Sequence, residues 1–262
     1  DGRARRAIDR ARVGTRKRPL GAAMLAKFAF EACGSEDAKA LIGEELDLDG
    51  EALPEALEGL SDQLGARDRP HAYPLSEASR LGKAGFGAHF DAAWGKIVAA
   101  CRSGSAYDGE ALGAVSQCLV ALSRHDVAHC RHVGAAGAMA FGVAVATGAR
   151  ALEDQLETCA RQLEAVEGQS PSKKVKKGSK REAVAAAAAE LEASLEALDG
   201  FAEGVFEDVF CKRYRDARAC VRAAAVEGLA GWVRARPKRY LDAKYLKYAA
   251  WCLDFPDARE RA

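Results

Sequence analysis

The stretch ALEDQLETCARQLEAV (151–166) sets its apolar residues four, three, four and three positions apart. A second stretch, REAVAAAAAELEASLEALDG (181–200), repeats this spacing. Seven-residue repeats of this kind place an apolar seam along one face of an α-helix, which then packs against a partner helix. The sequence therefore predicts two long helices joined along seams made of Leu152, Leu156, Cys159, Leu163 and Val166 on the first and Val184, Ala188, Leu191, Leu195 and Leu198 on the second.

Between the two seams lies GQSPSKKVKKGSK (168–180), in which Gly, Ser and Pro interrupt the helix and the lysines keep the segment hydrated. Two helices in sequence with a short connection fold back on one another. We therefore expect an antiparallel helical hairpin with a basic loop over 167–181 at its tip. The cations of this loop are Lys173, Lys174, Lys176, Lys177, Lys180 and Arg181.

The rest of the chain is also rich in helix-forming Ala, Leu, Glu, Arg and Lys, and it contains no convincing alternating run typical of a β-strand. We divide the whole chain into a basic, disordered lead-in (1–20), a helical domain (21–166), the basic loop (167–181), and a last part (182–262) that holds the second hairpin helix. Further helices are expected at 21–33, 36–45, 51–64, 86–101, 108–122 and 126–166.

The last part of the chain repeats itself. RDAR (215–218) returns as PDAR (256–259), 41 residues later, which is a period typical of HEAT and armadillo helix pairs. The first unit follows the D-x4-V-R-x2-A pattern of a second HEAT helix, in which Asp caps the helix and Val and Ala face its neighbour. The predicted fold class is thus all-α, a HEAT-like helical-repeat solenoid with a protruding antiparallel hairpin, and the pattern residues are Asp216, Val221, Arg222 and Ala225.

Charge is segregated along the chain, although the net charge is only +1. Residues 31–68 carry twelve acids against two bases, whereas 1–20 and the loop at 167–181 are basic. Such asymmetry favours a polyanionic partner, and the alternative is a basic loop that is only a hydrated surface. The chain opens without Met and stops inside an apparent helix, so we expect it to be a fragment of a longer protein.

The eight cysteines form no C-x-x-C pair and fall among apolar neighbours, which favours free thiols in a reducing compartment. Residues 132–149 lack charge over 18 positions, but they are mostly Ala and Gly. Such a segment is too weakly apolar to prefer lipid, so we expect a buried helix there and no membrane span.

One stretch, RHDVAHCRH (124–132), is close to the H-E-x-x-H zinc pattern, with His125 and His129 four apart and His132 as a conceivable third ligand. Asp126 replaces the required Glu, however, and arginines flank the cluster, so we expect no metal. A Gly-rich phosphate loop and a G-x-S-x-G elbow are also absent from the sequence. The sequence therefore predicts a protein that is not an enzyme and holds no cofactor.

The region 206–254 reads FEDVFCKRYRDARACVRAAAVEGLAGWVRARPKRYLDAKYLKYAAWCLD. It closely resembles the stromalin conservative domain of the SA/STAG/Scc family of HEAT-type cohesin subunits, with its pieces F-V-H-R-Y-R-D, E-I-R-A-x-C-I-E-E-I-G-x-W and F-L-x-D-S-Y-L-K-Y-x-G-W. Upstream, AYPL (72–75) and AYDGEAL (106–112) resemble family segments, and Arg131-His132 match the family's R-H. The resemblance runs from about residue 24 to the end and covers a STAG-like domain over 21–166 and a truncated conservative domain within 182–262. It departs from the family at Cys211, Lys212 and Glu227-Gly228.

The resemblance implies a non-catalytic subunit that works in sister chromatid cohesion in the nucleus, bound to chromatin. Its partners would be cohesin kleisin and SMC subunits, with the kleisin surface mostly outside this chain, and double-stranded DNA bound without sequence specificity. The residues that match, or combine with, the family's DNA groove are the cations of the basic loop together with Lys212, Arg213, Arg215 and Arg218.

Tyr214 and Trp251 match two aromatics that form a pocket in the family for Phe/Tyr-containing motifs of regulatory proteins, such as CTCF-like or shugoshin-like ligands. An aromatic pair flanked by cations suits such a motif. Trp232 is assigned to the core. The rival hypothesis is a general helical-repeat adaptor that binds only proteins, and a metal-dependent enzyme is a distant third.

Overall fold

The computed structural model of the chain describes residues 18–42, 52–65, 73–104, 106–167 and 174–252. Apart from one short two-stranded ribbon, its regular elements are helices, which confirms the predicted all-α class. The helices before the hairpin are α2 (Arg18–Ala32), α3 (Ala38–Leu41), α4 (Ala52–Gly65), α5 (Arg80–Lys83), α6 (Phe86–Ala100) and α7 (Gly109–Ser123). The later ones are α8 (Ala128–Glu167), α9 (Lys174–Val205), a π-helical turn η2 (Phe206–Phe210), α10 (Cys211–Arg213), α11 (Ala219–Ala235), α12 (Pro237–Tyr240) and α13 (Ala243–Cys252).

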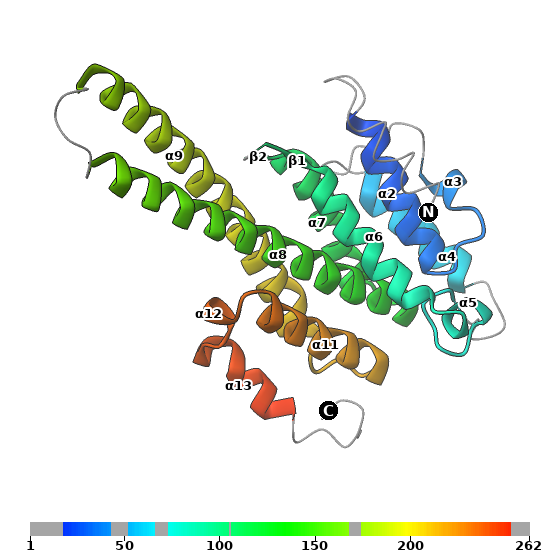
Figure 1. The fold of residues 1–262 in the computed structure, drawn as a ribbon. Coiled ribbons are helices and arrows are strands. Elements are labelled where there is room, and N and C mark those ends of the chain that lie inside the picture. Colours follow the sequence, from blue (N-terminus) through cyan, green and yellow to red (C-terminus); the bar gives the residue numbers. More distant parts are fainter. Residues whose placement is uncertain (1–17, 43–51, 66–72, 105, 168–173, 253–262) are drawn as a thin grey trace.

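Helix α8 is the centre of the fold, with α6 and α7 on one side, α11 on the opposite side and α9 alongside (Figure 1). Its first half is long and apolar enough to pass for a membrane span by composition. More than half of that segment is instead buried in the protein, as expected, because small residues on α8 let its neighbours approach closely. Gly142, for example, lies directly against the ring of Trp232, which is fully buried and donates its Nε1–H to the Met139 carbonyl at 3.1 Å.

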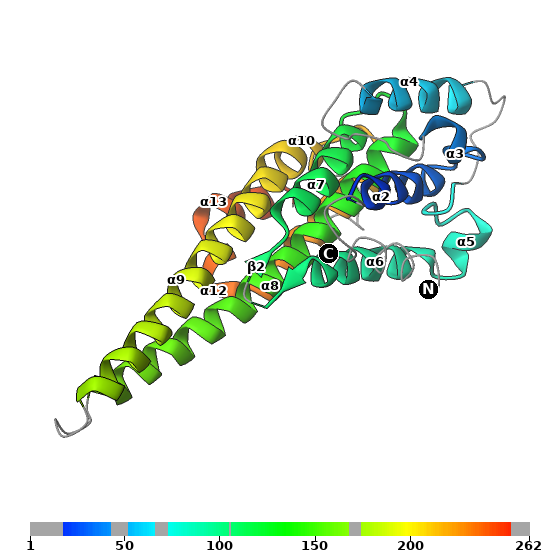
Figure 2. The same cartoon turned by 90° about the horizontal axis from the view of Figure 1, so that it is seen from above.

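The second half of α8 pairs with α9 to form the predicted hairpin, which projects from the body of the molecule (Figure 2). Both seams face inward: Leu152, Val166, Leu191 and Leu198 are buried, and the other predicted seam residues are partly buried. One boundary differs from the expectation. Helix α9 begins at Lys174, so the basic residues from there to 181 lie in its first two turns and not in a loop. Lysine is a good helix former, and the helix tolerates the Gly and Ser among these residues.

The base of the hairpin is fixed by one arginine. Arg236, at the junction of α11 and α12, leaves only 4% of its side chain exposed. It donates to Glu153 on α8 at 2.7 Å and also to Asp199 on α9. This cation therefore ties the C-terminal helices to both hairpin helices at once, and Arg239 adds an ion pair to Asp199 at 3.1 Å.

Helix α9 runs on through η2 into α10, and α11 then folds back against α8. In the π-helical turn the rings of Phe206 and Phe210 stack with centroids 5.4 Å apart. Val221 and Ala225 on α11 are fully buried, as the HEAT pattern predicted. The second copy of that pattern, at 256–259, lies outside the described residues.

A short β-ribbon between α6 and α7 was not predicted from the sequence. Strand β1 (Arg102–Ser103) pairs antiparallel with β2 (Ala106–Tyr107), which leads into Asp108 at the N-cap of α7. The Asp108 carboxylate accepts a hydrogen bond from the Ala111 backbone N–H at 3.1 Å. Strands of two residues are too short to show an alternating pattern. Among the residues expected to be a disordered lead-in, 1–17 lie outside the described part, and α2 already begins at Arg18.

Candidate functional site

The cations at the hairpin tip lie at the end of the molecule farthest from its body (Figure 1). Lys174, Lys176 and Lys177 are on the first turn of α9, and Lys180 and Arg181 follow as exposed residues. Lys173 lies outside the described residues. The basic run from Lys174 to Arg181 therefore lies at the start of one helix.

The α9 side of the stem between this tip and the body contributes acids but no cations. Between Arg181 and Lys212 the sequence contains no Lys or Arg. Positive charge on the α9 rod is therefore confined to its two ends, although Arg150 and Arg161 lie on the other stem helix, α8, and cations of the C-terminal helices pair with some of the α9 acids. The intervening acids are Glu182, Glu190, Glu192, Glu196, Asp199, Glu203, Glu207 and Asp208.

The second set of predicted DNA-binding cations follows η2 at the body end. Arg215 and Arg218 are exposed, and the Arg215 guanidinium lies over the Tyr214 ring, 5.8 Å from its centroid. Lys212 is exposed but ion-paired with Asp208 at 3.1 Å. Arg213 is different, because its side chain is only 18% exposed and donates to Asp216 at 2.8 Å. We therefore treat Arg213 as a structural residue and leave it out of the DNA-contacting set.

Asp216 is the centre of a buried polar cluster that joins α8 to α11. Its carboxylate accepts hydrogen bonds from Arg131 at 3.0 Å, from Arg213, and from the Arg218 backbone N–H at 3.0 Å. Arg222 donates to its carbonyl oxygen at 2.7 Å. Burial acts to raise the pKa of Asp216, but the donors of Arg218, Arg131 and Arg213 outweigh burial and lower it.

Contacts around the same cluster bring together three segments that resemble the family, although these segments lie far apart in the sequence. Arg131, of the R-H pair, binds Asp216 of the RYRD segment. His132 Nδ1 lies 2.7 Å from the hydroxyl of Tyr73, which belongs to the AYPL segment. Burial and the neighbouring His129 lower the pKa of His132 to about 4. Three segments far apart in sequence therefore meet at one structural junction, which sequence reasoning missed because it could not pair residues 59 and 85 positions apart.

The zinc-like histidines do not converge on one point. His125 accepts from the Val127 backbone N–H at 3.0 Å and bonds the Leu57 carbonyl at 3.1 Å, so it caps the start of α8 and contacts α4. His129 stacks on Tyr73 with ring centroids 4.3 Å apart. In the described part of the chain, no three His, Cys, Asp or Glu side chains are placed to share a metal ion. All eight cysteines are free thiols.

The predicted peptide pocket is a stack of aromatic rings in which only the outermost is open. Tyr214 is 9% exposed, whereas Trp251 is 51% exposed. Their ring centroids are 6.4 Å apart, and Tyr248 packs edge-on against both, at 5.1 Å and 5.2 Å. Lys247 Nζ lies 5.1 Å from the Tyr248 centroid. Trp251 thus presents an aromatic surface at the end of this stack, and Tyr214 packs behind it.

Comparison with known proteins matches these segments. The STAG domain family matches residues 71–187, and the stromalin conservative domain family matches residues 215–262. Cohesin subunit SA-3 of Homo sapiens is 27% identical over 157 residues, which are 60% of this chain and 13% of that protein. Sister-chromatid cohesion protein 3 of Arabidopsis thaliana is 24% identical over 168 residues, which are 64% of this chain and 15% of that protein.

The fold is also similar to a solved one. Cohesin subunit Scc3 from Z. rouxii superimposes with a TM-score of 0.78 at 17% sequence identity, over 98% of this chain and 29% of that chain. The chain therefore spans a small part of the length of the proteins it matches. From the two domain matches and the shared fold, the chain belongs to the SA/STAG/Scc family of cohesin subunits, of which it carries the STAG domain and stromalin conservative domain segments.

Proposed function

We propose that this chain is the DNA-contacting and partner-docking N-terminal part of a non-catalytic cohesin subunit, acting in sister chromatid cohesion on chromatin in the nucleus. Membership of the family supports the cohesin role, and the matched relatives bear names of cohesin subunits. The distribution of charge supports DNA contact. The observation that carries it is the cluster of cations at the start of α9, after which the helix contains no Lys or Arg as far as Lys212.

Two sets of cations would contact the duplex. The first is the hairpin tip, which we define as Lys173, Lys174, Lys176, Lys177, Lys180 and Arg181, and the second is the body set, Lys212, Arg215 and Arg218. Lys and Arg side chains can neutralise phosphates but present no array of groups for reading base edges. Lys180, Arg181 and the three residues of the body set are exposed. Binding by them should be independent of sequence and steeply dependent on salt.

The geometry limits how one duplex could reach both sets. Lys180 and Lys212 are 32 positions apart on a nearly continuous helical rod, which corresponds to about 48 Å at 1.5 Å per residue. Because the α9 stem between them contributes no cation, the duplex would contact this rod only near its two ends. At 3.4 Å per base pair, it would need about 14 base pairs to reach both ends.

Fluorescence anisotropy tests this proposal with a duplex of about 30 base pairs at low salt. The tip variant changes Lys174, Lys176, Lys177 and Lys180 to Glu. The matched control changes four cations elsewhere, Lys27, Lys39, Arg80 and Lys83, to Glu, so that the net charge falls by the same amount. We expect the tip variant to lose most of its affinity and the control to lose little. Equal losses would show a net-charge effect and no DNA surface at the tip.

Duplex length tests the joint use of both sets. A duplex of about 10 base pairs is too short to span both sets. For this duplex, changing Lys212, Arg215 and Arg218 to Glu should lower the affinity by the same factor in the tip variant as in the wild type. With 30 base pairs, the two sets of changes should be strongly coupled, because one bound set raises the effective concentration of the other. Additive effects at both lengths would mean that the sets bind separate duplexes.

Docking of a regulatory peptide at Trp251 is the second part of the proposal. An exposed Trp in a ring cluster whose Tyr214 and Tyr248 carry Arg215 and Lys247 fits a peptide with an aromatic anchor and acidic neighbours, which is the chemistry implied for CTCF-like or shugoshin-like ligands. Titration of a Phe-containing acidic peptide should quench the Trp251 fluorescence, and Trp251→Ala should abolish binding. Kleisin and SMC partners follow from the family, with the kleisin surface mostly beyond this chain.

The alternative is an adaptor of the same helical-repeat type that binds only proteins. It shares the peptide site but not the phosphate contacts. Peptide binding at Trp251 without salt-sensitive duplex binding would favour that alternative. Peptide binding together with salt-sensitive duplex binding would favour the proposed cohesin subunit.

A further inference from the structure

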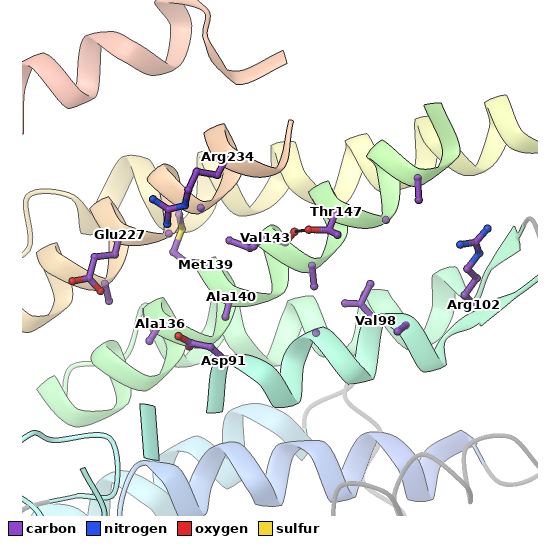
Figure 3. A pocket seen from close by; sticks show the side chains of 18 of the residues that line it. Asp91, Val98, Arg102, Ala136, Met139, Ala140, Val143, Thr147, Glu227 and Arg234 are labelled. Carbon is purple, nitrogen blue, oxygen red and sulfur yellow. Dashed lines mark hydrogen bonds between the residues drawn. The ribbon is translucent and has the colours of Figure 1, made fainter. Parts of the chain in front are cut away.

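A groove of about 960 Å³ lies between α6, the middle of α8 and α11, on a different part of the molecule from the hairpin tip and Trp251 (Figure 3). Its floor is one face of α8 from Ala136 to Ala151, which corresponds to about 22 Å or four helical turns. The floor is small and apolar, with Met139, Ala140, Val143 and Ala144 in its middle. Helices α6 and α11 form the two walls.

The groove favours a helix over an extended peptide. Its floor and both main walls are α-helices, whose backbone N–H and C=O groups are already used within each helix. Two further lining residues, Arg102 and Tyr107, come from the short β1–β2 ribbon at the end of the groove away from Asp91. Along the helical floor and walls, an extended peptide would therefore find no backbone partners and would leave most of its own polar groups unsatisfied. A helix satisfies its own backbone and can lay an apolar face on a floor of small residues.

Charges of opposite sign mark different positions along the groove. Asp91 on α6 and Glu227 on α11 both lie near Ala136 at one end (Figure 3), and the described residues supply no ion pair to either. Burial in the groove, with the charge of Glu227 second, raises the pKa of Asp91. Arg234 follows seven residues after Glu227, and Arg102 eleven after Asp91, so the cations lie about 10 Å and 16 Å farther along.

We propose that this groove docks an amphipathic helix of a partner protein, about four turns long, with small apolar residues on its buried face. A Lys or Arg of that helix lies between Asp91 and Glu227. An Asp or Glu seven to eleven residues away lies beside Arg234 or Arg102. The acids and the apolar floor make this surface unsuitable for nucleic acid, so it adds a protein-binding site beyond the proposed function.

Gly95 provides a way to block the groove without disturbing the fold. It lines the α6 wall, and a Cβ built there meets nothing within 4 Å. Gly95→Leu should therefore fill part of the groove and, if anything, favour the helix. Gly113 on α7 is the matched control, because it is also helical, lies outside the groove and has equally open space around its Cβ.

The test uses two labelled helical peptides of about 18 residues with the same apolar face. Probe A carries one Lys and one Glu nine positions apart, and probe B carries Glu at both positions. Fluorescence anisotropy should show that the wild type binds probe A about tenfold more tightly than probe B. Asp91→Lys with Glu227→Lys should reverse this preference, because the groove then carries cations throughout.

Gly95→Leu should weaken probe A at least tenfold, whereas Gly113→Leu should leave it unchanged. Circular dichroism of each variant checks that the chain remains folded. The proposal is overturned if neither probe binds below about 500 µM, if both bind the wild type equally, or if Gly95→Leu has no effect. Light scattering that shows a dimer of this chain, lost in Gly95→Leu, would also overturn it, since a second copy would then occupy the groove.

Discussion

Removing the carboxylate of Asp216 should lower the free energy of unfolding strongly, because this one carboxylate accepts hydrogen bonds from three donors. Asp216→Ala deletes the acceptor of Arg131, Arg213 and the Arg218 backbone N–H. The two guanidiniums, 17% and 18% exposed, would keep their charge without a partner. Breaking a buried pair costs about 3–5 kcal/mol, and the partial hydration of these arginines places the expected loss at about 3 kcal/mol.

Urea unfolding followed by circular dichroism measures this loss, and the thermal midpoint should fall by about 6–12 °C for a chain of this size. The control is Asp154→Ala, which removes an exposed pair with Arg150 at 3.2 Å and should change the unfolding free energy by less than about 0.5 kcal/mol. Arg131→Met added to Asp216→Ala should restore part of the stability, because one unpaired cation is removed. A cost below about 1 kcal/mol for Asp216→Ala would refute the view that this cluster holds α8 to α11.

The stability that Asp216 contributes depends on pH with a definite sign. The folded pKa of Asp216 is lowered, so the stability that it contributes is fully present above the unfolded pKa of about 3.9 and is lost as pH falls through the folded value. The difference in unfolding free energy between the wild type and Asp216→Asn should therefore be constant from pH 5 to 7 and shrink below about pH 4. A difference that vanished already at pH 6 would contradict this assignment.

Three shorter predictions concern other parts of the molecule. Gly142→Ala should cost about 1–3 kcal/mol or more in urea unfolding, because its Cβ would overlap the buried ring of Trp232; a neutral effect would show that α11 can shift away from α8. Trp251→Ala should change the unfolding free energy by less than about 1 kcal/mol, since the side chain is half exposed, while peptide titration loses its signal. His132, with a pKa of about 4, should stay neutral from pH 5 upward in an NMR titration, and the stability linked to its neutral form should be lost between about pH 6.5 and 4, whereas an NMR pKa near 6.5 would contradict its burial beside Tyr73.

Helix positions and the hairpin were predictable because they depend on local periodicity. The seams from Leu152 to Val166 and from Val184 to Leu198 carry a repeat that only a helix pair satisfies. The start of α9 was misplaced because Gly178 and Ser179 indicate a break, although the surrounding lysines favour helix strongly enough to continue it. The ribbon at Arg102–Tyr107 was missed because its strands are too short to alternate.

The candidate site was predictable in its residue types but not in their pairings. Arg213 reads in sequence as one of four neighbouring surface cations, and only the fold shows that it turns onto Asp216 with Arg131 from α8. Tyr214 and Trp251 could be paired through the family resemblance, but the greater burial of Tyr214 comes from Tyr248 and Phe210 packing against it. The groove has no sequence signature, because it is formed by three helices that are far apart along the chain.

The most direct test of the central claim is the salt dependence of duplex binding by the wild type and the tip variant. Each phosphate contact contributes about 0.9 to the slope of log K against log salt, so raising salt from 50 to 200 mM should weaken binding about 3.5-fold per contact. We predict a steep slope for the wild type and a slope shallower by about 3–4 for the variant with Lys174, Lys176, Lys177 and Lys180 changed to Glu. Identical slopes, or no duplex binding by the wild type at 50 mM salt, would contradict the claim that the hairpin tip contacts DNA.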